Sequence, residues 1–175
     1  MVKRGLMIGR FQPFHLGHLN SIEQIFKEVD ELIILIGSAQ YSHSLKNPFT
    51  AGERIMMVHA ALTENGFDLT RCYIIPIMDT NDNRIWVAHL ITTIPTFDVA
   101  YTHNPLVKRL LVESKINVKS TKLFNRETYA ATEVRKRILN TGTWEELVPK
   151  SVAKIIKEIS GVDRIQQIND TTLKH

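Results

Sequence analysis

The chain has 175 residues, enough for one domain with a substantial core, and its hydrophobic content of 43% and charged content of 23% are typical of a globular protein. Its 22 Lys and Arg residues against 18 Asp and Glu residues favour small anionic ligands but are too mild an excess to indicate nucleic-acid binding. No apolar run approaches the roughly 18 residues that a membrane span needs, and the single Cys72 allows no internal disulfide, so we expect a cytoplasmic location.

Apolar runs and amphipathic segments alternate along the chain. A continuous apolar run predicts a buried strand, whereas apolar residues that recur every three or four positions predict a helix. In chain order these patterns predict strand 6–8, a helix from 16, strand 32–36, a helix after 50, strand 73–77, helix 85–94, strand 98–101, helix 106–113, strand 117–119, and helices 132–140 and 150–159. Such alternation indicates right-handed β-α-β units. The predicted fold class is α/β, a single Rossmann-like doubly wound parallel sheet with helices on both faces.

Capping signals and polarity set the expected boundaries. Thr50-Ala51-Gly52-Glu53 matches a capping box, which predicts a helix start. Gly142 follows helix 132–140 and is expected to cap its C-terminus. The chain becomes polar after Val162, so we expect one domain over 1–162 and a loosely ordered tail over 163–175.

The segment from Gly9 to His18, between the first strand and the first helix, carries most of the functional information. In an open α/β sheet, ligands bind beyond the carboxyl ends of the strands, and the free N–H groups of a helix start favour anions. His15 and His18 are spaced to lie on one side of the first helical turn and to donate hydrogen bonds into such a site. Gly17 between them leaves room for a phosphate to approach the backbone.

Commoner phosphate and metal motifs do not fit this segment. It contains no G-x-G-x-x-G and no G-x-x-x-x-G-K-[ST] loop, and the two histidines lack the neighbouring Cys or carboxylate of a zinc site. The alternative is that His15 and His18 only cap and solvate a helix start. Their place after a buried strand, beside Gly17 and Arg10, favours a phosphate site over that alternative.

Two motifs together resemble the nucleotidyltransferase superfamily. His15-Leu16-Gly17-His18 resembles its H-x-G-H signature, and Ala130-Ala131-Thr132-Glu133-Val134-Arg135 resembles its later S-x-T-x-x-R signature, in which Thr132 would cap a helix. Further segments resemble the archaeal-type nicotinamide-nucleotide adenylyltransferase family, and the resemblance covers Arg4 to Gly161. This chain has Ala130-Ala131 and Thr102-His103 where that family usually has Ser-Gly. The further segments are 37–40, 47–54, 85–87, 104–107 and 124–126.

The resemblance implies that the 5′-phosphate of nicotinamide mononucleotide attacks the α-phosphorus of ATP and releases pyrophosphate, a reaction of NAD biosynthesis. It implies that His15, His18 and Arg135 are catalytic and hold the reacting phosphates, with His18 the strongest candidate for a contact to the transition state. The alternative for Arg135 is a solvated helix face, and for Lys46 an ordinary exposed lysine. The other candidates for binding ATP and its phosphates are Gly9, Arg10, Phe11, Gly17, Lys46 and Thr132.

The implied reaction requires neither a general base nor a dedicated metal site on the protein. The attacking phosphate has a second pKa of about 6, so it is largely dianionic at neutral pH and requires no general base. No carboxylate cluster is evident, so we expect Mg²⁺ to be carried with ATP rather than on a dedicated protein site. The expected partners are ATP and nicotinamide mononucleotide, without nucleic acid or membrane, and the resemblance implies a homo-oligomer, for example a hexamer.

Four residues are candidates for the acceptor pocket: Asp79, Asn83, Trp86 and Phe124. A nicotinamide ring needs a flat stacking partner, which Trp86 offers, and polar partners for its carboxamide. The resemblance places the nicotinamide pocket here, with Phe124 as an apolar wall. The alternative for both aromatic residues is a place in the hydrophobic core.

Two competing functions remain open. The first is another adenylyl- or cytidylyltransferase, for example one acting on phosphopantetheine or flavin mononucleotide, which Trp86 with Asp79 and Asn83 disfavours. The second is a nucleotide sensor without catalysis, which the two cationic motifs disfavour.

Overall fold

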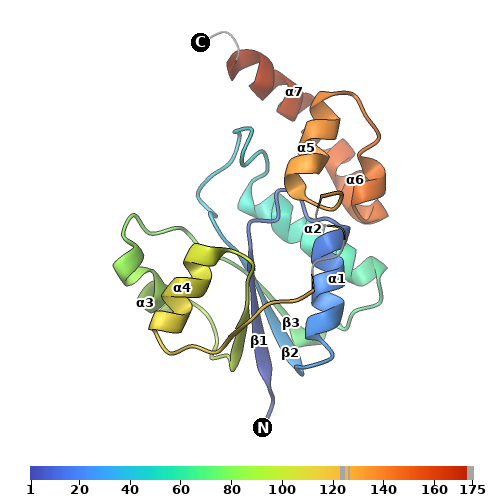
Figure 1. Cartoon of the computed structure of the whole chain (residues 1–175). Coiled ribbons are helices and arrows are strands. Elements are labelled where there is room, and N and C mark those ends of the chain that lie inside the picture. The colour runs from blue at the N-terminus through green and yellow to red at the C-terminus, as the bar shows by residue number, and fades with distance from the viewer. Residues whose placement is uncertain (123–124, 126, 173–175) are drawn as a thin grey trace.

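A five-stranded parallel sheet forms the centre of the molecule (Figure 1). The computed structural model describes residues 1–122, 125 and 127–172, and the strand order is β3-β2-β1-β4-β5 with every neighbouring pair parallel. This confirms the predicted α/β fold. The strands are β1 (Arg4–Gly9), β2 (Glu31–Ile36), β3 (Cys72–Pro76), β4 (Val99–Tyr101) and β5 (Val118–Lys119).

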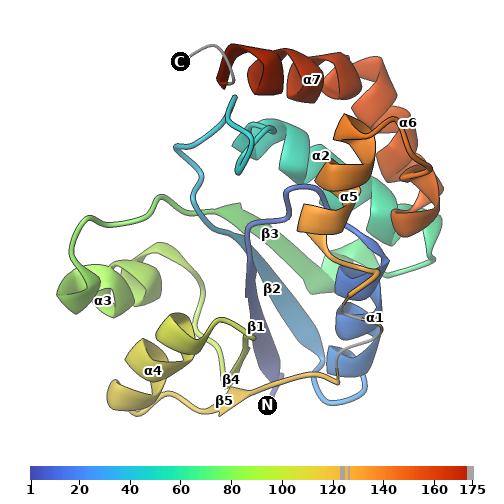
Figure 2. The same cartoon turned by 45° about the horizontal axis from the view of Figure 1, so that its top comes forward.

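Helices cover both faces of this sheet (Figure 2). Helices α3 and α4 lie on one face, and α1 and α2 lie on the other, where α5, α6 and α7 extend the layer beyond the strand ends. No helix in the described part of the chain is both long enough and apolar enough to cross a membrane. The helices are α1 (Leu16–Ile25), α2 (Ala51–Glu64), α3 (Asn83–Thr93), α4 (Pro105–Glu113), α5 (Ala131–Leu139), α6 (Lys150–Glu158) and α7 (Gly161–Thr172), with short 3₁₀ turns at Leu69–Arg71 and Glu145–Leu147.

The hydrophobic core has two layers because the sheet is covered twice. Successive strand residues point to opposite faces, so Leu6 of β1 packs with α3 and α4, whereas Met7 packs with α1 and α2. In β2, Leu32–Ile36 are all fully buried, which explains why this strand is continuously apolar rather than alternating.

The strand order reverses between β1 and β4. After β1 the chain adds β2 and β3 on one side, and then crosses back to add β4 and β5 on the other. The loops that leave β1 and β4 therefore diverge over opposite faces, which opens a crevice at the carboxyl ends of these two strands. This is the part of the sheet where the Gly9–His18 segment lies.

The predicted capping signals are confirmed at one helix and modified at another. At the start of α2, the Glu53 backbone N–H donates to Thr50 Oγ1 (3.2 Å) and the Thr50 N–H donates to Glu53 Oε2 (2.8 Å), as the capping box predicts. After α5, the Gly142 N–H donates to the Arg137 carbonyl (2.8 Å). However, Thr141 and not Gly142 adopts the left-handed conformation, with φ at 53°.

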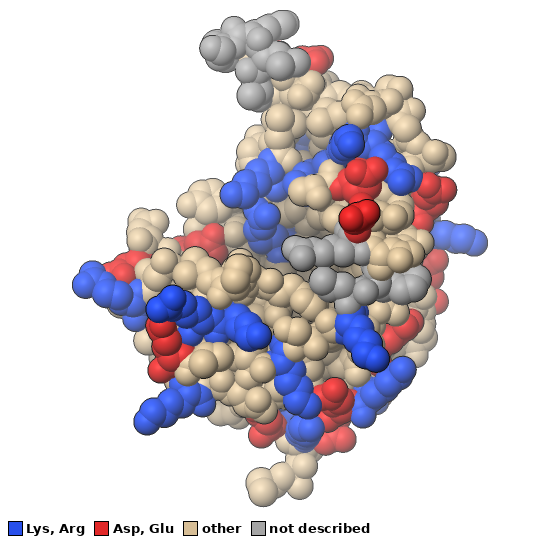
Figure 3. Space-filling model, in the orientation of Figure 1, with Lys and Arg blue, Asp and Glu red and all other residues tan. Residues whose placement is uncertain are grey.

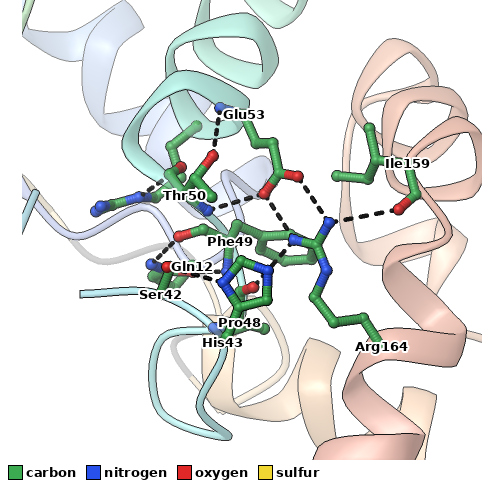
Figure 4. A network of polar contacts seen from close by, with 10 residues as sticks. Gln12, Ser42, His43, Pro48, Phe49, Thr50, Glu53, Ile159 and Arg164 are labelled. Atoms are coloured by element: carbon green, nitrogen blue, oxygen red, sulfur yellow. Dashed lines mark hydrogen bonds and ion pairs between the residues drawn. The ribbon is translucent and has the colours of Figure 1, made fainter. Parts of the chain in front are cut away.

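The expectation of a loosely ordered tail after Val162 is wrong for residues 163–172, which belong to α7. Ile165 is fully buried, and Arg164 makes a two-pronged ion pair with Glu53 of α2, at 2.7 and 2.8 Å (Figure 4). The polar composition misled the prediction because two anchoring residues are enough to dock a helix whose other side faces solvent.

Candidate active site

Two neighbouring cavities open at the carboxyl ends of β1 and β4, and both are lined by Ile8 and Thr102. The first cavity, of about 210 Å³, lies on the α1 side and is also lined by His15, Gly17 and His18. The second cavity, of about 530 Å³, lies on the side of α3 and α4. Figure 3 shows Lys and Arg side chains beside the hollow between the α3–α4 part and the α5–α7 part of the molecule.

His15 and His18 form a stacked pair at the start of α1. His15 is the N-cap residue, and the two rings lie 3.6 Å apart between centroids at an angle of 25°. The backbone N–H of His15 donates to Nδ1 of His18 over 3.3 Å. Because Nδ1 accepts this bond, a neutral His18 must carry its proton on Nε2, which makes Nε2–H the available hydrogen-bond donor.

Burial keeps both histidines uncharged in the free protein. It lowers the pKa of His15 to about 3, and burial together with the neighbouring His15 lowers the pKa of His18 well below its usual value. The description of this motif as cationic does not suit the unliganded state, because burial and the close approach of the two rings disfavour their charged forms. A bound phosphate would raise both pKa values again by supplying the missing counter-charge.

Tight packing fixes the pair in place. The Phe11 ring contacts the His18 ring at a centroid distance of 4.7 Å, and Phe14 contacts it at 5.4 Å. A Cβ at Gly17 would come within 2.9 Å of the Tyr129 carbonyl oxygen and 3.0 Å of the His15 ring. Gly17 is thus required by the close approach of α1 to the chain before α5. Phe11 is almost fully buried and lines neither cavity, so its side chain supports His18 instead of facing a ligand.

Helix α5 places Arg135 against the segment that carries the histidines. Nη1 of Arg135 donates to the Gln12 carbonyl (2.7 Å), which brings the two sequence motifs together across the fold. Burial lowers the pKa of Arg135, and the charge of Arg10 lowers it further. Two guanidinium groups close enough to repel each other indicate a place where an anion would be favourable.

The start of α5 differs from the prediction in one respect. Its N-cap is Ala130, in an extended conformation and without a side-chain cap, while Thr132 is the exposed second residue of the helix. The expectation that Thr132 caps this helix is therefore wrong, because the helix begins one residue earlier, at Ala131. Ala130 and Ala131 line the first cavity, so this uncapped helix start faces it.

The second cavity brings together three of the four predicted acceptor residues. Asp79, Asn83 and Trp86 all line it, and Trp86 is 8% exposed because its ring also packs in the core beneath α3. Trp86 is thus both a core residue and part of the cavity wall. The fourth candidate, Phe124, lies outside the described residues.

Gly9, Arg10 and Lys46 line the second cavity as well, although the sequence grouped them with the ATP-binding residues. They are separated from His15 and His18 because β1 ends between the two cavities. Lys46 and Arg10 are exposed, so their charges are available to a ligand at that mouth.

Asp79 is held in place by the loop after β2. Ser38 Oγ donates to Asp79 Oδ2 (2.6 Å), the Asp79 backbone N–H donates to Gln40 Oε1 (3.0 Å), and Gln40 Nε2 donates to the Asp79 carbonyl (3.2 Å). These three bonds join the loops that follow β2 and β3 into one wall of the second cavity.

Two polar residues that no sequence pattern singled out organise this region. Gln12 is 2% exposed, and its amide exchanges two hydrogen bonds of 2.9 Å with the backbone of Phe49 (Figure 4). Arg54 is fully buried in α2 and donates to backbone carbonyls of the loops after β1 and β2. The sequence does contain an indication of this role for Arg54. It is a charged residue four positions before Val58, at a place where the helical periodicity predicts a buried apolar side chain.

The described residues offer no obvious resident metal site. Among them, no group of three or more His, Cys, Asp and Glu side chains is placed to hold an ion. Asp79 is the one carboxylate among the described residues that line the two cavities, and the Ser38 hydroxyl already donates to it.

The chain is similar in sequence to proteins of a known family. Residues 6–137 match the cytidylyltransferase-like family model. Two similar proteins are both named nicotinamide-nucleotide adenylyltransferase. The one from Archaeoglobus fulgidus is 50% identical over 169 residues, covering 95% of this chain and 97% of the relative. The one from Methanococcus aeolicus is 51% identical over 166 residues, covering 95% of each chain.

A similar solved structure is a bifunctional NMN adenylyltransferase/ADP ribose pyrophosphatase from Francisella tularensis. It has a TM-score of 0.82 at 22% identity and covers 99% of this chain, which spans 55% of that longer one. At this identity the likeness concerns the fold alone. The family match and the close relatives together show that this chain belongs to the cytidylyltransferase-like nucleotidyltransferases, within the nicotinamide-nucleotide adenylyltransferase family.

Proposed function

We propose that this protein transfers AMP from ATP to the 5′-phosphate of nicotinamide mononucleotide and thereby forms NAD and pyrophosphate. The observation that carries the proposal is the pair of cavities that meet at the ends of β1 and β4. A two-substrate transfer needs two binding sites whose reacting groups meet, and the shared edge at Ile8 and Thr102 provides that meeting point. The names of the similar archaeal proteins support the same reaction.

The first cavity is suited to the AMP part of ATP. His15 and His18 lie in its wall, and the uncapped start of α5 contributes backbone N–H groups at Ala131 and Thr132. His18 Nε2–H would donate to the α-phosphoryl group, and Arg135 would reach the β- and γ-phosphates from α5. Gly17 keeps the start of α1 free of a side chain that would obstruct the approach of the phosphates to His18 and Arg135.

The second cavity is suited to the mononucleotide. Its Trp86 ring offers an apolar face to a nicotinamide ring, and Asp79 and Asn83 offer polar partners for the carboxamide or the ribose. Arg10 and Lys46 line the same cavity and would attract the 5′-phosphate to the edge that the two cavities share. Repulsion between that phosphate and ATP is thereby reduced before the reaction.

The chemistry then depends on position and on stabilising charge. An oxygen of the acceptor phosphate attacks the α-phosphorus, the bond from this phosphorus to the bridging oxygen breaks, and pyrophosphate leaves with the electron pair. Negative charge that builds on the α-phosphoryl oxygens and on pyrophosphate is met by donors that are already in place, His18 and Arg135. Mg²⁺ bound to the triphosphate neutralises part of its charge, and a structural neighbour was solved with AMP and a manganese ion.

The test is pyrophosphate release measured with ATP and a panel of acceptors. The panel contains nicotinamide mononucleotide, flavin mononucleotide, 4′-phosphopantetheine and no acceptor. We expect release only with nicotinamide mononucleotide, together with stoichiometric NAD. Equal or greater pyrophosphate release with another acceptor would show that the protein is a different nucleotidyltransferase. Tight nucleotide binding without pyrophosphate release would identify a nucleotide sensor. Light scattering on the same sample tests the proposed homo-oligomer, with a hexamer as the specific case.

A further inference from the structure

Arg54 is a fully buried arginine that makes no ion pair with a carboxylate in the part of the chain that the structure describes. Its guanidinium donates to the carbonyls of Arg10 (2.9 Å), Gly37 (2.8 Å) and Ser38 (3.2 Å), and its Nε donates to the Thr50 carbonyl (3.2 Å). Burying a charge is expensive, and an apolar side chain often stabilises a fold as well or better. A buried, carbonyl-bound guanidinium is therefore more than a packing element.

Three of the four carbonyls that accept hydrogen bonds from Arg54 belong to residues that line the second cavity. Arg10, Gly37 and Ser38 all line that cavity, whereas Arg54 itself does not. Arg54 thus lies directly behind the wall and joins the loop after β1 to the loop after β2. The planar guanidinium can serve diverging acceptors at once, which an ammonium on a flexible stem cannot do in the same geometry.

Two residues in these loops adopt conformations that need external support. Ser38 has φ at 52°, and Phe11, which follows Arg10, has φ at 51°. Non-glycine residues in the left-handed region persist where their surroundings hold them. In each case Arg54 donates a hydrogen bond to a carbonyl at the left-handed residue or next to it. The acceptors are the carbonyl of Ser38 itself and the carbonyl of Arg10, which precedes Phe11.

The left-handed turn at Ser38 has a direct consequence for the acceptor pocket. It aims Ser38 Oγ at Asp79, to which it donates over 2.6 Å. A continuous chain of contacts therefore runs from Arg54 through the Ser38 backbone and hydroxyl to Asp79, the carboxylate of the second cavity. On the other side, the same guanidinium fixes the backbone of Arg10, whose side chain lines the same cavity.

We propose that Arg54 is a positioning residue for the acceptor: by fixing the backbones of Arg10 and Ser38, it sets the distance between the phosphate-attracting side and the Asp79 side of the second cavity. The proposal rests on the function proposed above, because it concerns how well the mononucleotide is held. It predicts that loss of the guanidinium geometry affects the acceptor more than ATP, although Arg54 touches neither.

The test begins with Arg54→Lys, which retains a positive charge but not the forked set of donors. We expect kcat/KM for nicotinamide mononucleotide to fall about 10- to 100-fold, as for a small misplacement of a binding group, while the KM for ATP changes less than about threefold. Melting temperature is measured on the same sample, and kinetics are recorded well below it. Equal losses for both substrates, or no loss for the acceptor, would overturn the proposal.

Arg4→Lys is the matched control at the opposite end of the sheet. Arg4 also uses its guanidinium to bridge strands, through Glu31 (2.6 Å) and the Thr96 carbonyl (2.8 Å). We expect this variant to lose stability with unchanged kinetic constants. If Arg4→Lys altered acceptor binding as much as Arg54→Lys, general loosening of the sheet would explain both, and the positioning role would be wrong.

Ser38→Ala provides a test that does not depend on Arg54→Lys folding. It removes only the hydroxyl that holds Asp79, so the melting temperature should stay nearly constant while the KM for nicotinamide mononucleotide rises severalfold. In the double variant the two effects should be less than multiplicative, because both changes act through Asp79. An unchanged acceptor KM in Ser38→Ala would overturn the proposal. Absence of NAD formation by the unaltered protein would instead contradict the proposed function.

Discussion

The two cavities that meet at the end of β1 are built in opposite ways. The first owes its chemistry to a helix start and a buried, uncharged histidine pair packed on Phe11 and Phe14. The second combines Asn83 and Trp86 of α3 with loops that carry exposed charges at Arg10, Lys46 and Asp79. A tightly packed wall suits the reacting phosphoryl group, since donors there need no reorganisation. A wall of charged loops suits the capture of an anionic substrate from solution.

The largest effect is expected when His18 is removed from the wall of the first cavity. His18→Ala should lower kcat about 10²- to 10³-fold with a smaller change in the KM for ATP, because one donor to the transition state is lost. Steady-state kinetics at saturating acceptor measure this. His59→Ala, at an exposed position of α2, is the control and should be silent. An unchanged kcat with a higher KM for ATP would show that His18 only binds the ground state.

A somewhat smaller effect is expected where the acceptor is captured. Trp86→Ala should raise the KM for nicotinamide mononucleotide about 5- to 100-fold, as for loss of about 1–3 kcal/mol of ring stacking. Because Trp86 is also a core residue, the same change should destabilise the fold by about 3–5 kcal/mol.

Trp86→Phe separates the two contributions of Trp86, because it retains an aromatic face. Trp144→Phe is the matched control, since Trp144 is buried in the opposite core layer and lines neither cavity. We expect both variants to lose stability, and only Trp86→Phe to raise the acceptor KM. If the acceptor KM were unchanged in both Trp86 variants, the nicotinamide ring would have to bind elsewhere.

Arg135 lines neither cavity, and variants at this position test whether the α5 side of the proposed phosphate site works through geometry or through diffuse charge. Arg135 already donates to the Gln12 carbonyl, so a lysine there cannot both maintain that bond and span two phosphate oxygens. We expect Arg135→Lys to lower kcat/KM for ATP about tenfold, while Lys136→Ala, at the exposed neighbour, stays near wild type. Equal losses at the two positions would indicate a purely long-range charge effect.

The last expected effect concerns the pH dependence of stability and leaves catalysis aside. The pKa of His15 is lowered to about 3, so between its unfolded value of 6.5 and pH 3 the unfolded state binds more protons than the folded one. Stability from this group is therefore fully present above pH 6.5 and is lost as the pH falls, by up to about 1.4 kcal/mol per pH unit.

Denaturant unfolding of the wild type and of His15→Asn at several pH values measures this slope. The carboxylates titrate in both proteins, so the difference between the two slopes isolates the histidine. We expect His15→Asn to flatten the curve below pH 6.5. A saturating non-hydrolysable ATP analogue should flatten the wild-type curve as well, because its phosphates restore the pKa of the histidines. Parallel curves for the two proteins would mean that the pKa of His15 is the same in the folded and unfolded states, and that burial does not lower it.

Much of the fold followed from local patterns. The apolar run 32–36 predicted a doubly buried strand, and the Thr50–Glu53 capping box predicted the start of α2; both are confirmed. Helix α7 was missed because a single buried Ile165 and one ion pair are too weak a periodic signal in a polar segment. The start of α5 was misplaced by one residue, since Ala130 caps without the side-chain oxygen that sequence patterns rely on.

The sequence by itself determined the β-α-β order, the H-x-G-H segment after the first strand, and the residue types of the proposed acceptor pocket, because these depend on neighbours within a few positions. Only the tertiary structure decided that burial lowers the pKa values of His15 and His18, since this depends on packing against residues such as Phe11 and Phe14. It alone placed Lys46 and Arg10 with Trp86, and Arg54 behind them. Desolvation and long-range hydrogen bonds arise when distant segments pack, and no local pattern records them.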